Sequence, residues 1–288
     1  MHDPTLPSLT HSAAKGPESK AIKFSIVTPT LNAARFFSKC LQSVQEQRSS
    51  SIEVQHLILD GGSTDGTLGL AVGYPVTLVP RPASTKLVDA ICLGFEAADG
   101  DLVAFLGADD VVLPGAFEAI AETFRRERRD AIFCRTRWVD SDLASLGELA
   151  PTPHWLTAHA HASLGWCYMS ASSTYITPKL YHELGGFDRS YTKSSDYEFY
   201  TRMLKLQIPY SRVQKTVSMY RRHNNNESLR QDDEYWRDFK MVRKTYAPNS
   251  KIATFFWGAL LKTWIYGRNP KWAYHQISRK LRSGSMVG

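Results

Sequence analysis

Short apolar runs alternate with helically spaced apolar positions through most of the chain. The runs end in turn residues, which is typical of strands, and the stretches after them carry the spacing of amphipathic helices. We predict strands at Ile22–Thr28, Glu53–Leu59, Val76–Val79, Leu102–Leu106 and Ala131–Cys134. We predict helices at Ala33–Gln47, Lys86–Ala98 and Pro114–Arg128, with a short helix from Asp65. Alternating strands and helices indicate an α/β fold with a mainly parallel sheet flanked by helices.

Three regions of the chain differ in composition. Residues 1–20 are rich in Pro, Ser, His and Lys and poor in apolar residues, so we predict a disordered N-terminal tail. Residues 21–245 carry the α/β pattern and form the expected main domain. Residues 246–288 are basic and rich in aromatic residues, and their Ile252–Tyr266 segment predicts an amphipathic helix with a narrow polar stripe.

The overall composition fits a soluble globular protein. Lys and Arg number 35 against 28 Asp and Glu, and 43% of the residues are hydrophobic, which excludes disordered and fibrous classes. The sequence has no apolar run of about 18 residues for a membrane span, and we see no secretory signal. The four cysteines are far apart, so we expect reduced thiols in a cytoplasmic protein rather than a zinc site or a disulfide framework.

Positive charge is concentrated at the C-terminal end. Residues 237–288 hold eleven Lys and Arg and a single acid, Asp238, so the remaining chain is mildly acidic. Tryptophan and tyrosine are interspersed with these cations, as in helices that lie in the interface of an anionic membrane. One interpretation is therefore a peripheral association with the inner face of the cell membrane. The alternative is a helix that packs on the main domain or forms a homodimer contact. We expect no nucleic acid partner, because no recognised module accompanies the basic residues.

Polar clusters follow three of the predicted strands. They are TPTLN at residues 28–32, DGGSTDGT at residues 60–67 and GADD at residues 107–110. In open parallel sheets, ligands bind beyond the carboxyl ends of the strands, where these clusters are expected to meet. Taken singly, the second cluster is also a turn in which Ser63, Thr64 or Asp65 caps a helix. Adjacent carboxylates at Asp109 and Asp110 repel unless a cation or donor stabilises them, and such oxygen ligands suit Mg²⁺ or Mn²⁺ carrying phosphates.

These segments, taken in order, resemble the family 2 glycosyltransferases, whose fold is the GT-A type. The resemblance covers residues 23–225 and rests on IVTPTLN, LILDGGSTDGT, Thr85–Ala90, AFLGADDVVLPGAF, Tyr175–Asp188 and Ser195–Phe199. It implies an inverting transfer of a sugar from a nucleoside-diphosphate sugar, most often UDP-linked, to a glycan or lipid-linked acceptor. Such reactions occur in bacterial envelope or exopolysaccharide synthesis.

The resemblance also implies roles for individual residues. Nine residues would contact the nucleotide: Thr28, Pro29, Thr30, Asn32, Asp60, Ser63, Lys86, Asp89 and Ala108. Asp60 would accept a hydrogen bond from the base. Asp109 would bind Mn²⁺ or Mg²⁺, Asp110 would face the donor sugar or the metal, and His223 would approach the diphosphate and the metal. Gly107 stands where the family's D-x-D motif has its first acid.

The resemblance assigns Asp196 as the general base that takes a proton from the acceptor hydroxyl. The alternative is an acid that stabilises a helix start, because Asp196 lies in the first turn of a predicted helix. Ser195 replaces the glutamate that usually precedes this residue. We expect Trp155, Trp166 and Tyr168 to line the acceptor pocket, since aromatic faces stack on sugars.

Two competing functions remain at this stage. One is a non-catalytic nucleotide-sugar or glycan-binding protein on the same fold, suggested by Gly107 and Ser195. The other is a nucleotidyltransferase, which is disfavoured because residues 30–34 are not a glycine-rich basic phosphate loop. The histidines at 154, 159 and 161 lack zinc-site spacing, so we interpret them as hydrogen-bonded or pocket-lining residues rather than metal ligands.

Overall fold

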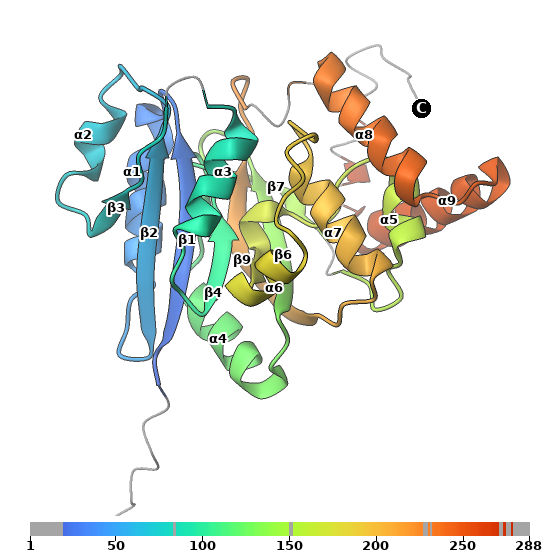
Figure 1. Cartoon of the computed structure of the whole chain (residues 1–288), viewed down its shortest axis with the longest axis horizontal. Coiled ribbons are helices and arrows are strands. Elements are labelled where there is room, and N and C mark those ends of the chain that lie inside the picture. The colour runs from blue at the N-terminus through green and yellow to red at the C-terminus, as the bar shows by residue number, and fades with distance from the viewer. Residues whose placement is uncertain are drawn as a thin grey trace, which may run out of the picture.

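A mixed sheet of nine strands organises the part of the chain that the structure describes. The structure is a computed structural model that describes residues 20–82, 85–149, 152–226, 230, 232–270, 273–274 and 278. The strands are β1 (Ile22–Thr30), β2 (Ile52–Asp60), β3 (Val76–Leu78), β4 (Leu102–Phe105), β5 (Val111–Val112), β6 (Ala131–Val139), β7 (Ser145–Glu148), β8 (Thr174–Ile176) and β9 (Ser211–Arg221). Their order is β3-β2-β1-β4-β8-β6-β9-β5, with β7 paired to β6 (Figure 1). The predicted tail, apart from Lys20, lies outside the described residues, as do residues 279–288.

Six of the strands end on the same side of the sheet. β1 pairs in parallel with β2 and β4, and β2 pairs in parallel with β3. β8 is antiparallel to both β4 and β6, so β6 runs in the same direction as β4, and β9 is parallel to β6. The carboxyl ends of β1, β2, β3, β4, β6 and β9 therefore share one side, which we call the carboxyl rim. The polar clusters after β1, β2 and β4 lie on this rim.

Helices cover both faces of the sheet. They are α1 (Ala34–Gln45), α2 (Thr67–Ala71), α3 (Leu87–Glu96), α4 (Ala116–Glu127), α5 (Ala158–Leu164), α6 (Pro178–Glu183), α7 (Ser195–Lys205), α8 (Asp233–Tyr246) and α9 (Lys251–Arg268). Residues of α1, α2 and α4 belong to the hydrophobic cluster on one face, and residues of α3, α5, α6, α7 and α9 belong to the cluster on the other. The strand pattern explains this division, because on β1 Phe24 and Ile26 join the first cluster and Val27 the second.

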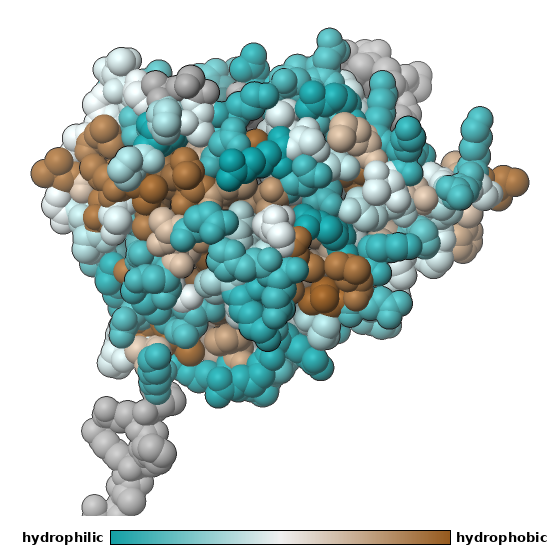
Figure 2. Space-filling model, viewed as in Figure 1, coloured by the Kyte–Doolittle hydropathy of each residue, from teal (hydrophilic) through white to brown (hydrophobic). Residues whose placement is uncertain are grey.

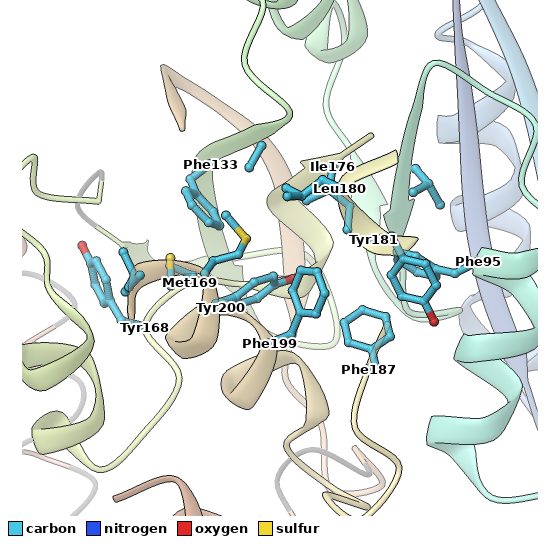
Figure 3. Packing of buried hydrophobic residues seen from close by; sticks show 14 of the residues in the cluster. Phe95, Phe133, Tyr168, Met169, Ile176, Leu180, Tyr181, Phe187, Phe199 and Tyr200 are labelled. Carbon is cyan, nitrogen blue, oxygen red and sulfur yellow. The ribbon is translucent and has the colours of Figure 1, made fainter. Parts of the chain in front are cut away.

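Aromatic packing joins α7 to the sheet and to α3. Phe199 lies 5.1 Å from Phe187, measured between ring centroids, and Phe187 lies 5.0 Å from Phe95 on α3. Next to Phe199, Tyr200 packs edge-to-face on Phe133 of β6 at 5.7 Å (Figure 3). This packing fixes where α7 begins, and α7 carries Asp196 in its first turn.

The predicted elements of the first half are confirmed, with small shifts at their ends. The α4 helix begins at Ala116 rather than Pro114, because Gly115 adopts a left-handed conformation (φ 65°) before the first helical residue. The continuous apolar run at residues 102–106 forms the central strand β4, where Leu102 and Val103 are fully buried. The sequence analysis did not predict β5, β7, β8 or β9. The four cysteines, all described, are free thiols as expected.

The predicted C-terminal helix is confirmed as α9, and it packs against the main domain. Thr254, Gly258, Leu261 and Ile265 form its buried face. A side-chain carbon added at Gly258 would lie 2.8 Å from the backbone oxygen of Ser163, so α9 approaches α5 as closely as glycine allows. None of the helices in the described ranges has the length and apolarity needed to span a bilayer.

Candidate functional site at the carboxyl rim

Asp60 is the last residue of β2 and lies on the carboxyl rim beside Thr30, the last residue of β1. Its Oδ1 accepts hydrogen bonds from the hydroxyls of Thr30 (2.8 Å) and Ser63 (2.5 Å), and its Oδ2 accepts from the backbone N–H groups of Gly62 (2.9 Å) and Ser63 (2.8 Å). Burial raises the pKa of Asp60, but the hydrogen bonds, led by that of the Ser63 hydroxyl, outweigh it, and the pKa lies below its usual value. Asp60 is therefore an ionised acceptor in a fixed position.

The loop after β2 is tied to the loop after β1. The side-chain oxygen of Asn32 accepts from the backbone N–H of Thr64 at 2.9 Å, and Asn32 itself is held in a left-handed conformation (φ 50°). Asp65 accepts from the N–H of Ala34 at 2.9 Å, and thus caps α1 from a neighbouring loop. Capping, the simpler explanation of the DGGSTDGT segment, therefore holds for Asp65, while Asp60 and Ser63 shape the rim.

Three of the residues expected to contact the nucleotide are instead internal. Thr28 and Thr30 are 0% and 2% exposed, and the Thr28 hydroxyl lies 2.9 Å from Nε2 of His56. Pro29 between them is also buried. The Thr28 and Thr30 side chains therefore position the end of β1, because burial and hydrogen bonding inside the sheet remove them from the surface. Asn32, one turn further, is exposed.

The start of α3 brings Lys86 and Asp89 to the same rim. Lys86 is exposed at the residue before the first helical turn, and Asp89 lies in that turn. Asp89 pairs with Arg189, whose Nη1 lies 3.5 Å from its Oδ1. This pair connects α3 to the loop that precedes α7.

Asp109 and His223 meet on the rim although they are far apart in the sequence. The Nε2 of His223 lies 2.9 Å from Oδ2 of Asp109, and the side-chain amide of Asn226 donates to the same oxygen at 2.8 Å. The other oxygen, Oδ1, accepts no hydrogen bond within the described residues. Asp109 is 27% exposed and His223 is 14% exposed, so both remain accessible from the rim.

Asp110 points away from this accessible pair. It is only 2% exposed, and its Oδ1 accepts from the backbone N–H of Arg221 at 2.9 Å. Burial, and then the charge of Asp109, raise the pKa of Asp110 well above its usual range. The prediction that Asp110 faces the donor sugar or the metal therefore does not match its position, because β9 covers its carboxyl group. Ala108 is likewise nearly buried, 9% exposed, in the cluster beneath.

Gly107 has a steric reason to lack a side chain. A carbon added there would lie 2.7 Å from Oδ1 of Asp109 and 3.2 Å from Oδ2 of Asp110. The two carboxylates thus occupy the space that an acid at residue 107 would need. The single accessible carboxylate of this loop is that of Asp109.

Cations that the sequence analysis missed gather beside Asp109. The guanidinium groups of Arg35 and Arg221 lie 4.8 Å and 4.4 Å from the ring centroid of Phe36, and the His223 ring lies 4.8 Å from the same centroid. The Nε of Arg221 also donates to the backbone oxygen of Asp109 at 2.8 Å. Phe36 therefore lies close to both the exposed Arg35 and the buried Arg221, and the two positive charges favour an anion such as a diphosphate nearby, with Arg35 free to contact it. Only their arrangement in space reveals this group, since β9 is remote in sequence from α1.

Arg81 is a second residue that the sequence analysis missed. Its guanidinium lies against the loop after β2, with Nη1 3.0 Å from the position of an added carbon at Gly61. Nη2 of Arg81 donates to the backbone oxygen of Thr85 at 2.8 Å. Arg81 therefore forms part of the wall next to Asp60, and Gly61 allows this close approach.

Asp196 lies at the same side of the molecule. The α7 helix ends at Lys205, and β9 begins at Ser211 at the opposite end of the sheet, so α7 starts on the side of the carboxyl rim (Figure 1). The Ser172 hydroxyl hydrogen-bonds to Asp110, and five residues earlier the pKa of the Cys167 thiol is raised by burial, the larger cause, and then by the negative charge of Asp196. Five extended residues span at most about 18 Å. Cys167 and Ser172 are therefore no more than about 18 Å apart.

The surroundings of Asp196 favour its protonated form. Burial raises the pKa of Asp196 to about 6, although the backbone N–H of Tyr197 donates to its Oδ1 at 2.8 Å. A carboxyl group with a pKa close to neutral both accepts a proton and releases it again, as a general base requires. The adjacent Ser195 is 7% exposed and offers no charge in place of a glutamate. Glu198 is buried and paired with Arg202, so it takes no part in the rim.

The aromatic residues expected in an acceptor pocket belong largely to the core. Tyr168 is 3% exposed, and the cavity that it borders measures about 10 Å³, room for about one water molecule. Trp155 packs edge-to-face on Trp264 of α9 at 5.7 Å, and Trp166 lies 5.8 Å from Tyr168. The prediction does not hold for Tyr168, because α9 and the sheet bury this region of the chain.

His159 and His161 both make hydrogen bonds within the described residues. His161 is fully buried, with Nδ1 2.9 Å from the Thr201 hydroxyl and Nε2 accepting from the N–H of Tyr168 at 3.4 Å. Burial lowers the pKa of His161 to about 3, so it is neutral. His159 is exposed and contacts the backbone oxygen of Tyr246 at 2.8 Å. Their expected hydrogen-bonded role is confirmed for both residues.

The rim offers one or two protein ligands for a cation that phosphate and water also coordinate, rather than a site made of protein ligands alone. Within the described ranges, no group of three or more His, Cys, Asp or Glu side chains is placed to hold a metal ion. Asp109 supplies its Oδ1, and His223, whose Nδ1 accepts from the N–H of Asn225, would supply Nε2 only on releasing Oδ2 of Asp109. Mg²⁺ and Mn²⁺ sites that carry phosphates commonly use one or two protein ligands together with water and phosphate oxygens. The donor pair therefore fits such a cation.

Comparison with known proteins places this arrangement in context. The model of glycosyl transferase family 2 matches residues 25–227. The uncharacterized glycosyltransferase YibD of Escherichia coli K12 is 27% identical over 52% of this chain and 44% of its own length. A PGL/p-HBAD biosynthesis glycosyltransferase of Mycobacterium bovis is 38% identical over 30% of this chain and 35% of its own length. The chain thus spans less than half of these relatives.

The fold matches solved structures as well. The crystal structure of Staphylococcus aureus TarS residues 1–349 in complex with UDP-GlcNAc superposes with a TM-score of 0.62. The match covers 85% of this chain and 73% of that one, at 15% sequence identity. At this identity the likeness concerns the fold, which is therefore the GT-A type predicted from the sequence.

Proposed function

Because the chain belongs to glycosyl transferase family 2, we propose that it is an inverting enzyme that moves a sugar from UDP to a glycan or lipid-linked acceptor. The observation that supports the proposal is that Asp60, the Asp109–His223 pair and the first turn of α7, which carries Asp196, all lie on the carboxyl-rim side of the sheet. These groups come from β2, β4, the segment after β9 and α7. Chemistry at a shared site is the simplest reason for such convergence.

The donor nucleotide is assigned to the part of the rim after β1 and β2. There Asp60 is ionised and fixed, Ser63 and Asn32 are tied together through the loops, and Arg81 lies against Gly61. A fixed carboxylate is suited to accept a hydrogen bond from the N–H of a base such as uracil. The likeness to TarS, whose structure was solved with UDP-GlcNAc, supports a UDP-linked donor.

The diphosphate is assigned to the neighbouring part of the rim. Asp109 and His223 would hold Mn²⁺ or Mg²⁺, and Arg35 and Arg221 add positive charge beside them. When bound, such a cation neutralises charge on the departing diphosphate. The buried Asp110 hydrogen-bonds to the backbone of Arg221, and so keeps β9 against the Asp109 loop.

Asp196 completes the proposed reaction. In the ionised form, its carboxylate takes the proton from an acceptor hydroxyl while the oxygen attacks the anomeric carbon. The bond from that carbon to the diphosphate oxygen breaks on the opposite side, UDP leaves with the bond electrons, and the configuration inverts. The proton then passes from Asp196 to water, and no covalent enzyme intermediate is needed.

A non-catalytic binding protein is the second candidate. Gly107 and Ser195 favour it, because each stands where the family resemblance implies an acid. The accessible Asp109 and the near-neutral pKa of Asp196 weigh against it, since a binding protein needs neither.

The two candidates differ in UDP release. We would measure UDP released with a panel of UDP-sugars, Mn²⁺ and lipid-linked or oligosaccharide acceptors, for the wild type and for Asp196→Asn and Asp109→Asn. The enzyme hypothesis expects a loss of about 10²-fold or more from the missing base. Asp142→Asn, an exposed acid beyond β6, is the matched control and should retain full activity. Equal turnover in all four proteins would contradict the assignments. If all four proteins, including the wild type, bind the UDP-sugar and none releases UDP, the second candidate is favoured.

A further inference from the structure

The outer face of α9 carries large apolar side chains. Ile252, Phe255, Phe256 and Leu260 are 83%, 77%, 58% and 40% exposed. At 100° per residue they lie on one side of the helix, opposite the buried Thr254, Gly258, Leu261 and Ile265. The polar stripe expected from the sequence thus points partly inward, and Phe255 and Phe256 point outward. Figure 1 shows α9 at the right of the molecule, and Figure 2 shows hydrophobic side chains at its projecting end.

The outer apolar residues are not needed for packing α9 against the main domain. The inner face of α9 is already closed on α5, where the backbone oxygen of Ser163 leaves no room for a side chain at Gly258. Single exposed apolar residues are common, but a continuous stripe along a helix usually marks a binding surface. The stripe extends over about two and a half turns, from Ile252 to Leu260.

The charged residues of α9 itself are all positive. Lys251 and Lys262 are exposed on α9, and Lys240 and Lys244 are exposed on α8. Residues 239–270 contain no Asp or Glu. The nearest preceding acid in the sequence, Asp238, is buried and accepts hydrogen bonds from Arg237 and from the backbone of Lys193. A partner for this surface must therefore offer both apolar material and negative charge.

We propose that the outer face of α9 docks into the interface of a bilayer that contains anionic lipids. Ile252, Phe255, Phe256 and Leu260 enter the boundary of the acyl chains, and Lys251 and Lys262 meet the headgroups. A second copy of this chain is the less suitable occupant, because pairing two such faces would bring like charges together. The docking goes beyond sugar transfer and gives the enzyme access to acceptors held at a membrane surface.

Vesicle flotation of the full chain tests the proposal. The wild type should float with vesicles of phosphatidylcholine and phosphatidylglycerol, bind phosphatidylcholine vesicles much less, and be released by salt. Phe255→Ser and Phe256→Ser should each weaken partitioning about tenfold. Val72→Ser, which removes an apolar side chain 82% exposed directly after α2, is the matched control and should bind as the wild type does.

A second pair of variants tests the charges. Lys251→Gln and Lys262→Gln should each weaken binding about fivefold, whereas Lys39→Gln on α1 should have no effect. The proposal is overturned if the wild type does not float with the vesicles. It is also overturned if Val72→Ser weakens binding as much as the Phe255 and Phe256 variants, or Lys39→Gln as much as the Lys251 and Lys262 variants. A third contrary result is a dimer, seen by sedimentation, that the Phe255 and Phe256 variants disrupt although the wild type binds no vesicles. UDP release to a soluble acceptor, measured without vesicles, reports separately on the proposed transfer.

Discussion

The raised pKa of Asp196 links its proposed role as a base to the stability of the fold. Burial raises its pKa to about 6, above the usual 3.8, so the fold favours the protonated form. The protonated carboxyl therefore stabilises the folded state at pH 4. This contribution is lost as the pH rises through 6, because Asp196 then ionises while buried. A residue that serves only to stabilise a helix start would have the opposite shift, because the helix dipole favours the charge.

The pH dependence of activity follows from this shift. We expect kcat/KM to fall about tenfold per pH unit below pH 6, because the protonated carboxyl cannot accept the acceptor's proton. We also expect Asp196→Asn to be more stable than the wild type at pH 8, by about 1 to 2 kcal/mol, and equally stable at pH 4. Activity assays and urea unfolding at both pH values check this. An Asn variant that is destabilised at pH 8 would show that Asp196 is structural.

Gly107 allows a second prediction about a single residue. Restoring the acid with Gly107→Asp should lower activity at least tenfold and destabilise the fold by about 1 to 3 kcal/mol, because the new side chain displaces the Asp109 carboxylate. Gly107→Ala brings the same added carbon without the charge, and should cause most of the same loss. Turnover and thermal unfolding measure both effects. An Asp variant with higher activity or tighter Mn²⁺ binding would show that Asp109 has room to move.

Among the elements, α9 has a testable contact with α5. Gly258→Ala places a carbon 2.8 Å from the Ser163 backbone oxygen, so we expect a loss of stability. On an unhindered helix the same change stabilises by about 1 kcal/mol. Gly267, which has no neighbouring atom within 4 Å of an added carbon, is the matched control on the same helix, and Gly267→Ala should be neutral or stabilising. Thermal unfolding of both variants gives the sign, and a stabilised Gly258→Ala would mean that α9 packs loosely.

The sequence predicted the first half of the sheet and little of the second. The apolar runs of β1, β2 and β4 carry strong patterns, because these strands are largely buried on both faces. The three residues of β8 and the two of β5 are too short for any periodicity to appear. Asp60, Asp109 and Asp196 were predicted because they lie in local motifs. Arg35, Phe36 and Arg81 were not, because their roles depend on contacts between remote segments.

At the scale of the whole molecule, the proposed donor site joins distant parts of the chain. The base would contact the segment after β2, and the diphosphate would contact residues after β4 and after β9. The site therefore exists only when both halves of the sheet are folded and paired. Any ligand that bridges these segments stabilises the folded state, by an amount set by its concentration relative to its Kd.

This linkage leads to a prediction that separates the two halves of the site. UDP with Mn²⁺ at 100 times its Kd should stabilise the protein by about 2.7 kcal/mol, and raise the midpoint of thermal unfolding by several degrees. Asp109→Asn should remove the increment that Mn²⁺ adds to UDP, and should leave the smaller shift caused by UDP alone. Asp60→Asn should reduce both, because the base loses its acceptor and the loop loses a charged anchor. Asp142→Asn is again the control. A Mn²⁺-dependent shift that survives in Asp109→Asn would place the cation elsewhere in the molecule, and the convergence of Asp109 and His223 would then need another explanation.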